Sequence, residues 1–142
     1  MKGGGMGLQS AIEAIQDVCL SVSGVRAAPD YPPESANAFP FVACYPTGGS
    51  FVGGPMGAMK ALHGIAVEVH VARRDLPNDV QAVISFGESI AAALLNSPTL
   101  AGTVDTIRAD EGISYTFGGM QWGDTQTIGY RLVVPVKIIT TL

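Results

Sequence analysis

The chain has 142 residues, of which 47% are hydrophobic and 14% are charged, and its formal net charge is −4. Ordinary soluble domains carry about 25% charged residues, so this composition excludes a disordered chain and indicates an apolar surface of the kind found in oligomers. Proteins that bind duplex DNA usually carry a basic surface, so the acidic balance argues against that function.

The length is that of one domain. Residues 1–7 are mostly glycine, so we expect a flexible N-terminal segment followed by a single domain over residues 8–142. Two cysteines are too few for a disulfide framework, no run of 18 apolar residues predicts a transmembrane helix, and the first residues lack the apolar centre of a signal peptide. We therefore expect a protein that is made in the cytoplasm and does not bind a membrane.

The first predicted element is a helix over residues 8–22. Its apolar residues recur at steps of three and four, which places them on one face: Leu8, Ala11, Ile12, Ile15, Val18, Cys19 and Val22. Three prolines between residues 29 and 33 exclude a helix or a central strand there, so we expect an extended connection. Residues 39–45 are aromatic and β-branched and predict a strand.

A glycine-rich segment over residues 46–61 is predicted to form a long flexible hairpin loop or arm. An exposed loop has little reason to carry large apolar side chains unless they contact a neighbouring molecule. We therefore regard Phe51, Val52, Met56 and Met59 as candidate contact residues for a second subunit or another protein. A phosphate-binding loop is the weaker interpretation, because no Gly-Lys-Ser/Thr sequence is present and the next predicted element is a strand.

The middle of the chain predicts a strand followed by a helix. Between residues 62 and 72 apolar residues alternate with Glu68 and His70, as expected for a strand with two different faces. A helix is predicted over residues 79–96 because Pro77 and Asp79 are typical of helix starts. Its predicted buried residues recur at helical spacing: Val80, Val83, Ile84, Gly87, Ile90, Ala91 and Leu94.

Short strands are predicted over residues 103–108 and 112–117, and a polar turn over residues 118–127. This turn carries Trp122, which we expect either to contact a neighbouring protein or to fold back over its own sheet. A long strand over residues 128–140 follows, with alternate apolar residues on one face. Pro135 has no N–H group, so it requires a sheet edge or a break in the hydrogen-bond ladder.

The resulting order of elements is helix, strand, strand, helix, strand, strand, strand. Strands that follow one another without crossover helices favour antiparallel pairing. We therefore predict an α+β fold: a mainly antiparallel sheet of about four to five strands with two helices packed on one face.

No predicted cluster carries the residues of a catalytic, cofactor-binding or metal site. Cys19 and Cys44 fall on apolar segments and are interpreted as buried core residues. Glu68 and His70 share one strand face, but two ligands do not make a metal site. Asp110 and Glu111 are adjacent in a predicted turn, where their side chains point apart. The protein is therefore expected not to be an enzyme.

The chain resembles the tail terminator proteins of long-tailed bacteriophages, also called minor tail or tail completion proteins. The resemblance extends over about residues 8–140. It rests on the order of elements and on short motifs: Val-Ser-Gly-Val at 22–25, Tyr-Pro-Pro at 31–33, Ser-Pro-Thr-Leu at 97–100, Gly-Ile-Ser-Tyr at 112–115, Trp-Gly at 122–123, Thr-Ile-Gly-Tyr-Arg at 127–131 and Val-Pro-Val-Lys-Ile at 134–138. None of these motifs is catalytic.

The resemblance implies a structural protein of the virion that forms a ring, with a hexamer expected. Such a ring caps the tail tube, stops its polymerisation and provides the surface for joining the tail to the head. The implied partners are the tail tube protein and the head–tail connector protein, and DNA passes through the lumen without specific binding. Alternatives are another ring protein of the same particle, such as a neck connector or tube subunit, and a small-molecule-binding α+β module.

Overall fold

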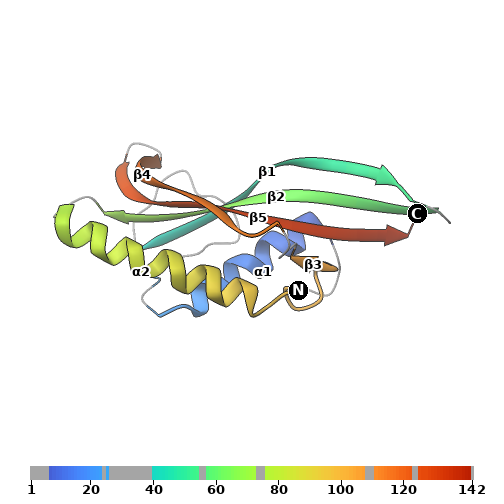
Figure 1. Cartoon of the computed structure of the whole chain (residues 1–142), viewed down its shortest axis with the longest axis horizontal. Helices are drawn as coiled ribbons and strands as arrows, with labels where there is room; N and C mark the ends of the chain where they lie inside the picture. Colours follow the sequence, from blue (N-terminus) through green and yellow to red (C-terminus); the bar gives the residue numbers. More distant parts are fainter. Residues whose placement is uncertain are drawn as a thin grey trace.

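The computed structural model describes residues 7–23, 25, 40–54, 57–72, 76–107, 111–122 and 125–141. Its elements follow one another in the order α1, β1, β2, α2, β3, β4, β5, which is the predicted order (Figure 1). The helices are α1 (Leu8–Ser21) and α2 (Leu76–Leu95), and the strands are β1 (Phe41–Gly53), β2 (Ala58–Ala72), β3 (Thr106–Ile107), β4 (Ser114–Trp122) and β5 (Thr125–Thr141).

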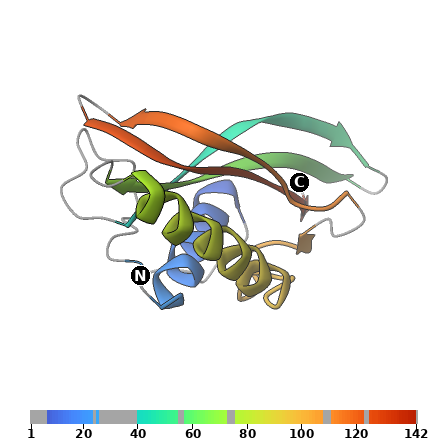
Figure 2. The same ribbon diagram turned by 60° about the vertical axis from the view of Figure 1, so that its left-hand side comes forward.

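The five strands form one antiparallel sheet with β5 at its centre. The pairing order is β1-β2-β5-β3, and β4 also pairs with β5 on the side away from β2. Both helices lie on the same side of the sheet, as the two views in Figures 1 and 2 show. The predicted α+β fold, with an antiparallel sheet and two helices on one face, is confirmed.

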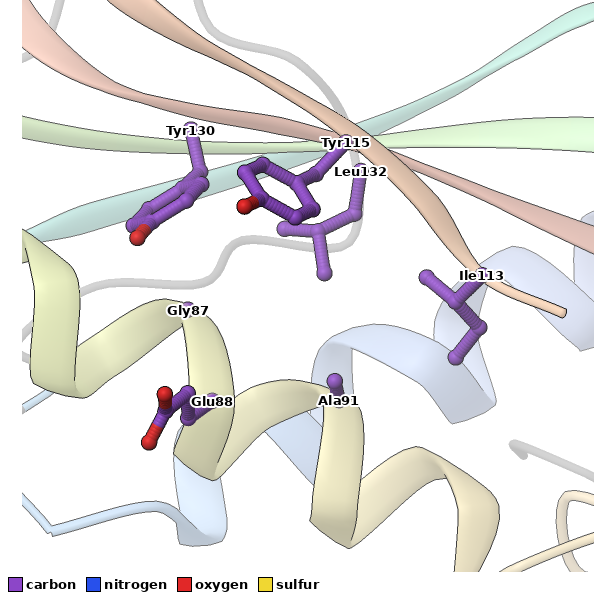
Figure 3. A pocket seen from close by; sticks show the side chains of 7 residues that line it. All are labelled: Gly87, Glu88, Ala91, Ile113, Tyr115, Tyr130 and Leu132. Carbon is purple, nitrogen blue, oxygen red and sulfur yellow. The ribbon is translucent and has the colours of Figure 1, made fainter.

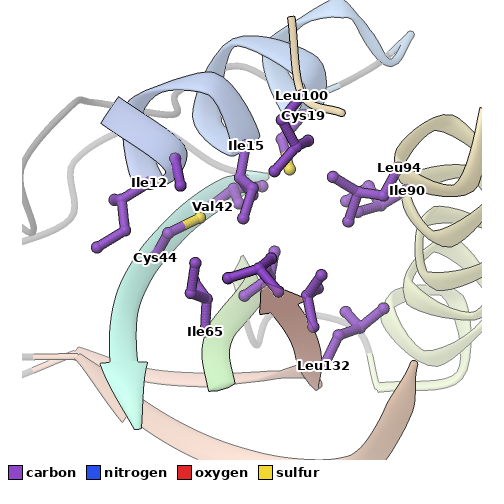
Figure 4. Close-up of a cluster of buried hydrophobic side chains, with 14 of the residues drawn as sticks. Ile12, Ile15, Cys19, Val42, Cys44, Ile65, Ile90, Leu94, Leu100 and Leu132 are labelled. Carbon is purple, nitrogen blue, oxygen red and sulfur yellow. The ribbon is translucent and has the colours of Figure 1, made fainter. Parts of the chain in front are cut away.

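The hydrophobic core lies between the helices and one face of the sheet, here called the inner face (Figure 4). α1 contributes the apolar residues of its predicted stripe, among them Ile12, Ile15 and Cys19. The alternation predicted for the last strand is also confirmed, because all its inner-face residues are buried: Ile128, Tyr130, Leu132, Val134, Val136 and Ile138. Burial of these apolar side chains supplies the main driving force for folding.

The predicted α2 stripe is not buried throughout. Gly87, Ile90 and Leu94 are buried as expected and Val80 and Ala91 are half-buried, whereas Ile84 is 47% exposed. The side chain of Val83 lies outside the described part of the structure. Successive helix residues are rotated by about 100° around the axis. Ile84 consequently lies at the margin of the stripe rather than at its centre.

Strand pairing extends further than the sequence predicts. β1 continues to Gly53 and β2 begins at Ala58, so the loop alternative for residues 46–61 is wrong for the described part: a β-hairpin occupies most of that segment. Residues 118–127, predicted as a turn, are also mostly strand, because β4 ends at Trp122 and β5 begins at Thr125. Backbone hydrogen bonds between strands overcome the weak strand preference of the many glycines.

Pro135 occupies the break in the ladder that its missing N–H group requires. On one side it pairs with Gly64 of β2. On the other side β4 starts opposite Val133 and β3 ends opposite Val136, so none of the described residues pairs with Pro135 there. The gap between β3 and β4 thus lies beside Pro135, which has no N–H group to donate to a neighbouring strand.

A compact turn after α2 carries the chain to the short strand β3. Leu100 and Ala101 have φ angles of 47° and 57°, in the left-handed region that non-glycine residues avoid. Leu100 is fully buried in the core, and the Ile107 amide donates to the Pro98 carbonyl at 2.7 Å. The burial of Leu100 under the sheet therefore offsets the unfavourable backbone conformation of the turn.

Candidate functional site

The β1–β2 hairpin extends past the helical layer and is called here the arm, comprising residues 46–54 and 57–62 (Figure 1). In β1 the first four residues are buried, whereas every residue from Pro46 to Gly53 is exposed. β1 is also an edge strand of the sheet. An edge strand with an exposed backbone is a surface to which another chain can add.

Two adjacent arm residues carry exposed apolar side chains on opposite faces of the sheet. Phe51 is 68% exposed and Val52 is 46% exposed. The Phe51 ring lies on the inner face, where it contacts the His63 ring edge-on with centroids 5.3 Å apart. Consecutive strand residues point to opposite faces, so Val52 lies on the outer face. The arm therefore offers apolar contacts on both of its sides.

Glycines allow the arm to form a close-packed hairpin. A Cβ atom on Gly49 would lie 2.0 Å from the Leu62 carbonyl oxygen, so only glycine fits at this position. At the end of the hairpin the Gly54 amide donates to the Ala58 carbonyl, and Gly57 has a φ of 76°. The glycines that suggested a loop in the sequence thus serve a tight paired structure.

The predicted contact residues do not form one cluster. Phe51 and Val52 are exposed on the arm, Met59 is half-buried in β2, and Met56 lies outside the described residues. Trp122 ends β4 and pairs with Thr125, at the opposite end of β5 from Ile138, which lies in the same row as Phe51. These two rows are thirteen residue steps apart along β5, which is roughly 40 Å. The arm and Trp122 therefore cannot contribute to the same contact within one subunit.

A pocket that the sequence did not predict lies between α2 and the inner face of β4 and β5. This pocket, called the aromatic groove, has a volume of about 240 Å³ and is lined by Gly87, Glu88, Ala91, Ile113, Tyr115, Tyr130 and Leu132 (Figure 3). Tyr115 is 64% exposed and its ring meets Tyr130 edge-on, with centroids 5.2 Å apart. Phe117, 44% exposed, contacts the same Tyr130 ring at 5.4 Å.

Gly87 allows α2 to approach Tyr130 closely. A Cβ atom on Gly87 would lie 2.6 Å from Tyr130 Cε2. Burial raises the pKa of the Tyr130 hydroxyl, and the nearby Tyr115 and Glu88 raise it further. Tyr130 is therefore a neutral, fixed wall of the groove, whereas Tyr115 and Glu88 face solvent. Periodicity marks Tyr130 only as a core residue, so no pattern in the sequence points to this pocket.

A chain of polar side chains crosses the outer face of the sheet from β1 to β5. The Tyr45 hydroxyl donates to Glu68 Oε2, and Glu68 Oε1 lies 2.8 Å from His70 Nε2. His70 Nδ1 lies 2.5 Å from Thr127 Oγ1. Since a carboxylate only accepts, His70 Nε2 is the donor, and in a neutral ring Nδ1 then accepts the Thr127 hydroxyl proton.

The neighbours of Glu68 favour its charged form. Burial acts to raise the pKa of the Glu68 carboxyl, but hydrogen bonds from His70 and Tyr45 and the charges of His70 and Arg131 outweigh it, so the pKa is lowered. Burial, together with the bond to Glu68, raises the pKa of Tyr45 to about 12. His70 and Thr127 are fully buried, so this chain ties three strands together rather than meeting a substrate.

The two cysteines are core residues, as the sequence predicts. Cys19 of α1 and Cys44 of β1 are both fully buried and reduced (Figure 4). Burial, and then a hydrogen bond with the Cys19 thiol, raises the pKa of Cys44. A thiol with a raised pKa is a poor nucleophile. Asp110 lies outside the described residues, whereas Glu111 is described and exposed.

Within the described ranges, no group of three or more His, Cys, Asp or Glu side chains is arranged to hold a metal ion. No helix in the part of the chain that the structure describes is long and apolar enough to cross a membrane. Comparison of the sequence with protein-family models and with curated proteins gives no match.

Proposed function

We propose that this chain is a structural virion protein, a tail terminator that assembles into a ring, with a hexamer expected. The ring caps the tail tube of a long-tailed bacteriophage and stops its polymerisation. It also provides the surface on which the head–tail connector protein docks. Its working location is the tail or neck of the virion, after assembly in the host cytoplasm.

The observation that carries this proposal is the arm. A hairpin that projects from the helical layer, exposes Phe51 and Val52 on opposite faces and lies at a sheet edge is typical of a segment that contacts another subunit. The α+β fold agrees with the order of elements on which the resemblance rests. The net charge of −4 suits a lumen that lets DNA pass without holding it.

Electron microscopy of the concentrated protein, alone and mixed with purified tail tubes, tests this proposal. We expect closed rings with a central channel, and rings seated on one end of each tube. Long tubes formed by this protein alone would instead identify a tube subunit. A protein that stays monomeric at every concentration and leaves tube ends bare would overturn the proposal.

The aromatic groove favours a second function, that of a small-molecule-binding module. Glu88, Tyr115 and Tyr130 bring one carboxylate and two hydroxyl groups to the edge of a pocket of about 240 Å³. Ligand pockets combine an apolar lining with a few such polar groups, but they usually measure about 300–1,000 Å³. The groove is therefore small for a metabolite, and assembly remains the function that we propose.

A further inference from the structure

The aromatic groove exists because short residues of α2 face long side chains of the sheet. Gly87 and Ala91 are four residues apart and therefore lie on the same face of the helix. At Gly87 the helix touches Tyr130, since a Cβ atom there would lie 2.6 Å from Tyr130 Cε2. Ala91 has only a methyl group, which leaves a groove of about 240 Å³ open between α2 and the sheet.

This groove has a polar end and an apolar end (Figure 3). The Glu88 carboxylate and the hydroxyl groups of Tyr115 and Tyr130 lie towards one end. Ile113 lies at the other end, and Leu132 lies between the two. A ligand that matches this lining has a polar group at one end and a short apolar chain at the other.

The elements that form the groove do not neutralise the charge of its polar end. Neither α2 nor β4 contains a Lys, Arg or His residue. The basic residues of β5, Arg131 and Lys137, alternate with its inner-face residues and so lie on the outer face of the sheet. The charge of Glu88 therefore favours a positively charged ligand group over a neutral or negative one.

An ammonium group matches the other atoms at this end. Ammonium has three N–H donors and no acceptor, whereas carboxylate and hydroxyl oxygens accept hydrogen bonds. The Tyr115 ring is 64% exposed, and the face of an aromatic ring attracts cations. The polar end thus offers an ammonium group one opposite charge, hydroxyl acceptors and an accessible ring.

The volume of the groove limits the rest of the ligand. Because cavities of about 150 Å³ bind benzene, a groove of about 240 Å³ has room for an ammonium group with an alkyl chain of about four carbons. Ligands of drug size occupy pockets of about 300–1,000 Å³. A nucleotide or a folded peptide segment is therefore too large.

We propose that the aromatic groove binds an alkylammonium group, with the charge beside Glu88 and the alkyl chain along Tyr115 and Leu132. The group belongs either to a free amine or to a lysine side chain, because both present the same butylammonium end. This inference goes beyond the terminator function and does not depend on it.

Titration with three four-carbon probes, followed by amide NMR spectra, tests the preference for charge. At pH 7 butylammonium is a cation, 1-butanol is neutral and butyrate is an anion. We expect butylammonium to bind with a Kd on the order of 1 mM and to shift the amide signals of Gly87, Glu88 and Tyr115. The other two probes are expected to bind at least about fivefold more weakly. Equal shifts from all three probes, or no shift in the groove with butylammonium at about 50 mM, would overturn the proposal.

Variants of two exposed groove residues test the assigned contacts. Glu88→Gln keeps the size of the side chain and removes its charge, and Tyr115→Ala removes the ring. Each is expected to weaken butylammonium binding at least about threefold. The matched controls are Asp17→Asn on α1 and Phe51→Ala in the arm, which remove an exposed acid and an exposed ring that do not line the groove.

The control variants are expected to change the binding of butylammonium less than about 1.5-fold. Unchanged binding in Glu88→Gln would overturn the assigned position of the charge. An equal loss in Asp17→Asn would show general attraction to an acidic protein and would also overturn the proposal.

A capped lysine, N-acetyl-lysine-N-methylamide, identifies the source of the ammonium group. Binding as tight as that of butylammonium supports a lysine side chain of a partner protein. Weaker binding, with butylammonium still bound, supports a free amine. If neither probe binds, the inference is wrong, whereas rings and capped tubes in micrographs still test the terminator function separately.

Discussion

The strands β1 and β2 have two parts: one is covered by the helices, and the other forms the arm. Comparing the two parts distinguishes residues that stabilise the fold from residues that are available for assembly. Under the helices, Val42, Ile65 and Val134 are fully buried in the core. Further along β1, the strand that β1 contributes to the arm lies at the sheet edge and is exposed on both faces. Antiparallel strand pairing is therefore stabilised by side-chain packing in the covered part. In the arm it is stabilised mainly by the backbone hydrogen bonds between the strands.

This difference shows that the residues that allow strand pairing need not be the residues that become buried. The covered part uses β-branched residues, which fill the space under the helices. The arm uses glycine where strands approach closely, as at Gly49, and places its large side chains towards solvent. The β1 residues of the arm, Pro46 to Gly53, are free to serve an interface because none of them belongs to the buried core.

The largest expected difference in unfolding free energy comes from truncating one side chain in each of the two regions. Ile65→Ala should lower the free energy of unfolding by about 4 kcal/mol, because it leaves a cavity in the core. Phe51→Ala should change it by less than about 0.5 kcal/mol, because its ring is mostly exposed. Urea denaturation at low protein concentration measures both values. Similar losses for the two variants would show that the arm is part of the folding core.

Two glycines, one in the covered part and one in the arm, extend the comparison to backbone packing. A Cβ atom on Gly129 would lie 1.7 Å from the Val69 carbonyl oxygen, whereas one on Gly53 has nothing within 4 Å. Gly129→Ala should therefore cost about 3 kcal/mol through overpacking, and Gly53→Ala less than about 1 kcal/mol. Thermal denaturation of the two variants checks this. Equal melting temperatures would contradict the tight packing of β2 against β5.

The polar chain on the outer face predicts a pH dependence for the covered part. Glu68→Gln should cost roughly 2 kcal/mol at pH 7, because it removes a charged acceptor from two hydrogen bonds. The pKa of Glu68 is lowered in the folded state, so its contribution is complete above the unfolded value of about 4.3.

As the pH falls from about 4.3 through the lower folded pKa, that contribution is lost. The stability curves of wild type and Glu68→Gln should therefore converge in acid. Urea denaturation in steps between pH 7 and pH 3 measures this convergence. Curves that stay parallel over the whole range would show that the folded state does not favour the charged form of Glu68.

The smallest expected effect concerns backbone conformation. The positive φ angles of the arm belong to Gly48 and Gly57, whereas the turn under the covered part places Leu100 and Ala101 in that region. Ala101 is exposed, so Ala101→Gly should remove the penalty without losing packing and stabilise the protein by about 1 kcal/mol. Calorimetry that finds a lower melting temperature for this variant would contradict the backbone conformation of the turn.

Periodicity predicted the elements of the covered part, because burial of one face imposes a repeat on the residues of α1, β2 and β5. It failed for the arm, where the glycines of β1 have no side chains to show a repeat and pairing depends on residues of β2. The aromatic groove and the polar chain were missed for another reason. Tyr115 and Tyr130, and likewise His70 and Thr127, meet only through strand register, which the sequence does not display.

Hydrogen exchange as a function of protein concentration tests the central claim that the arm is an assembly surface. The amides of residues 47–53 on the edge strand are compared with those of residues 65–71, which lie in the covered part and serve as the internal reference. We predict that concentration slows exchange in the arm several-fold and leaves the reference unchanged. Unchanged exchange in the arm, at concentrations where light scattering detects oligomers, would contradict the claim and place the interface elsewhere.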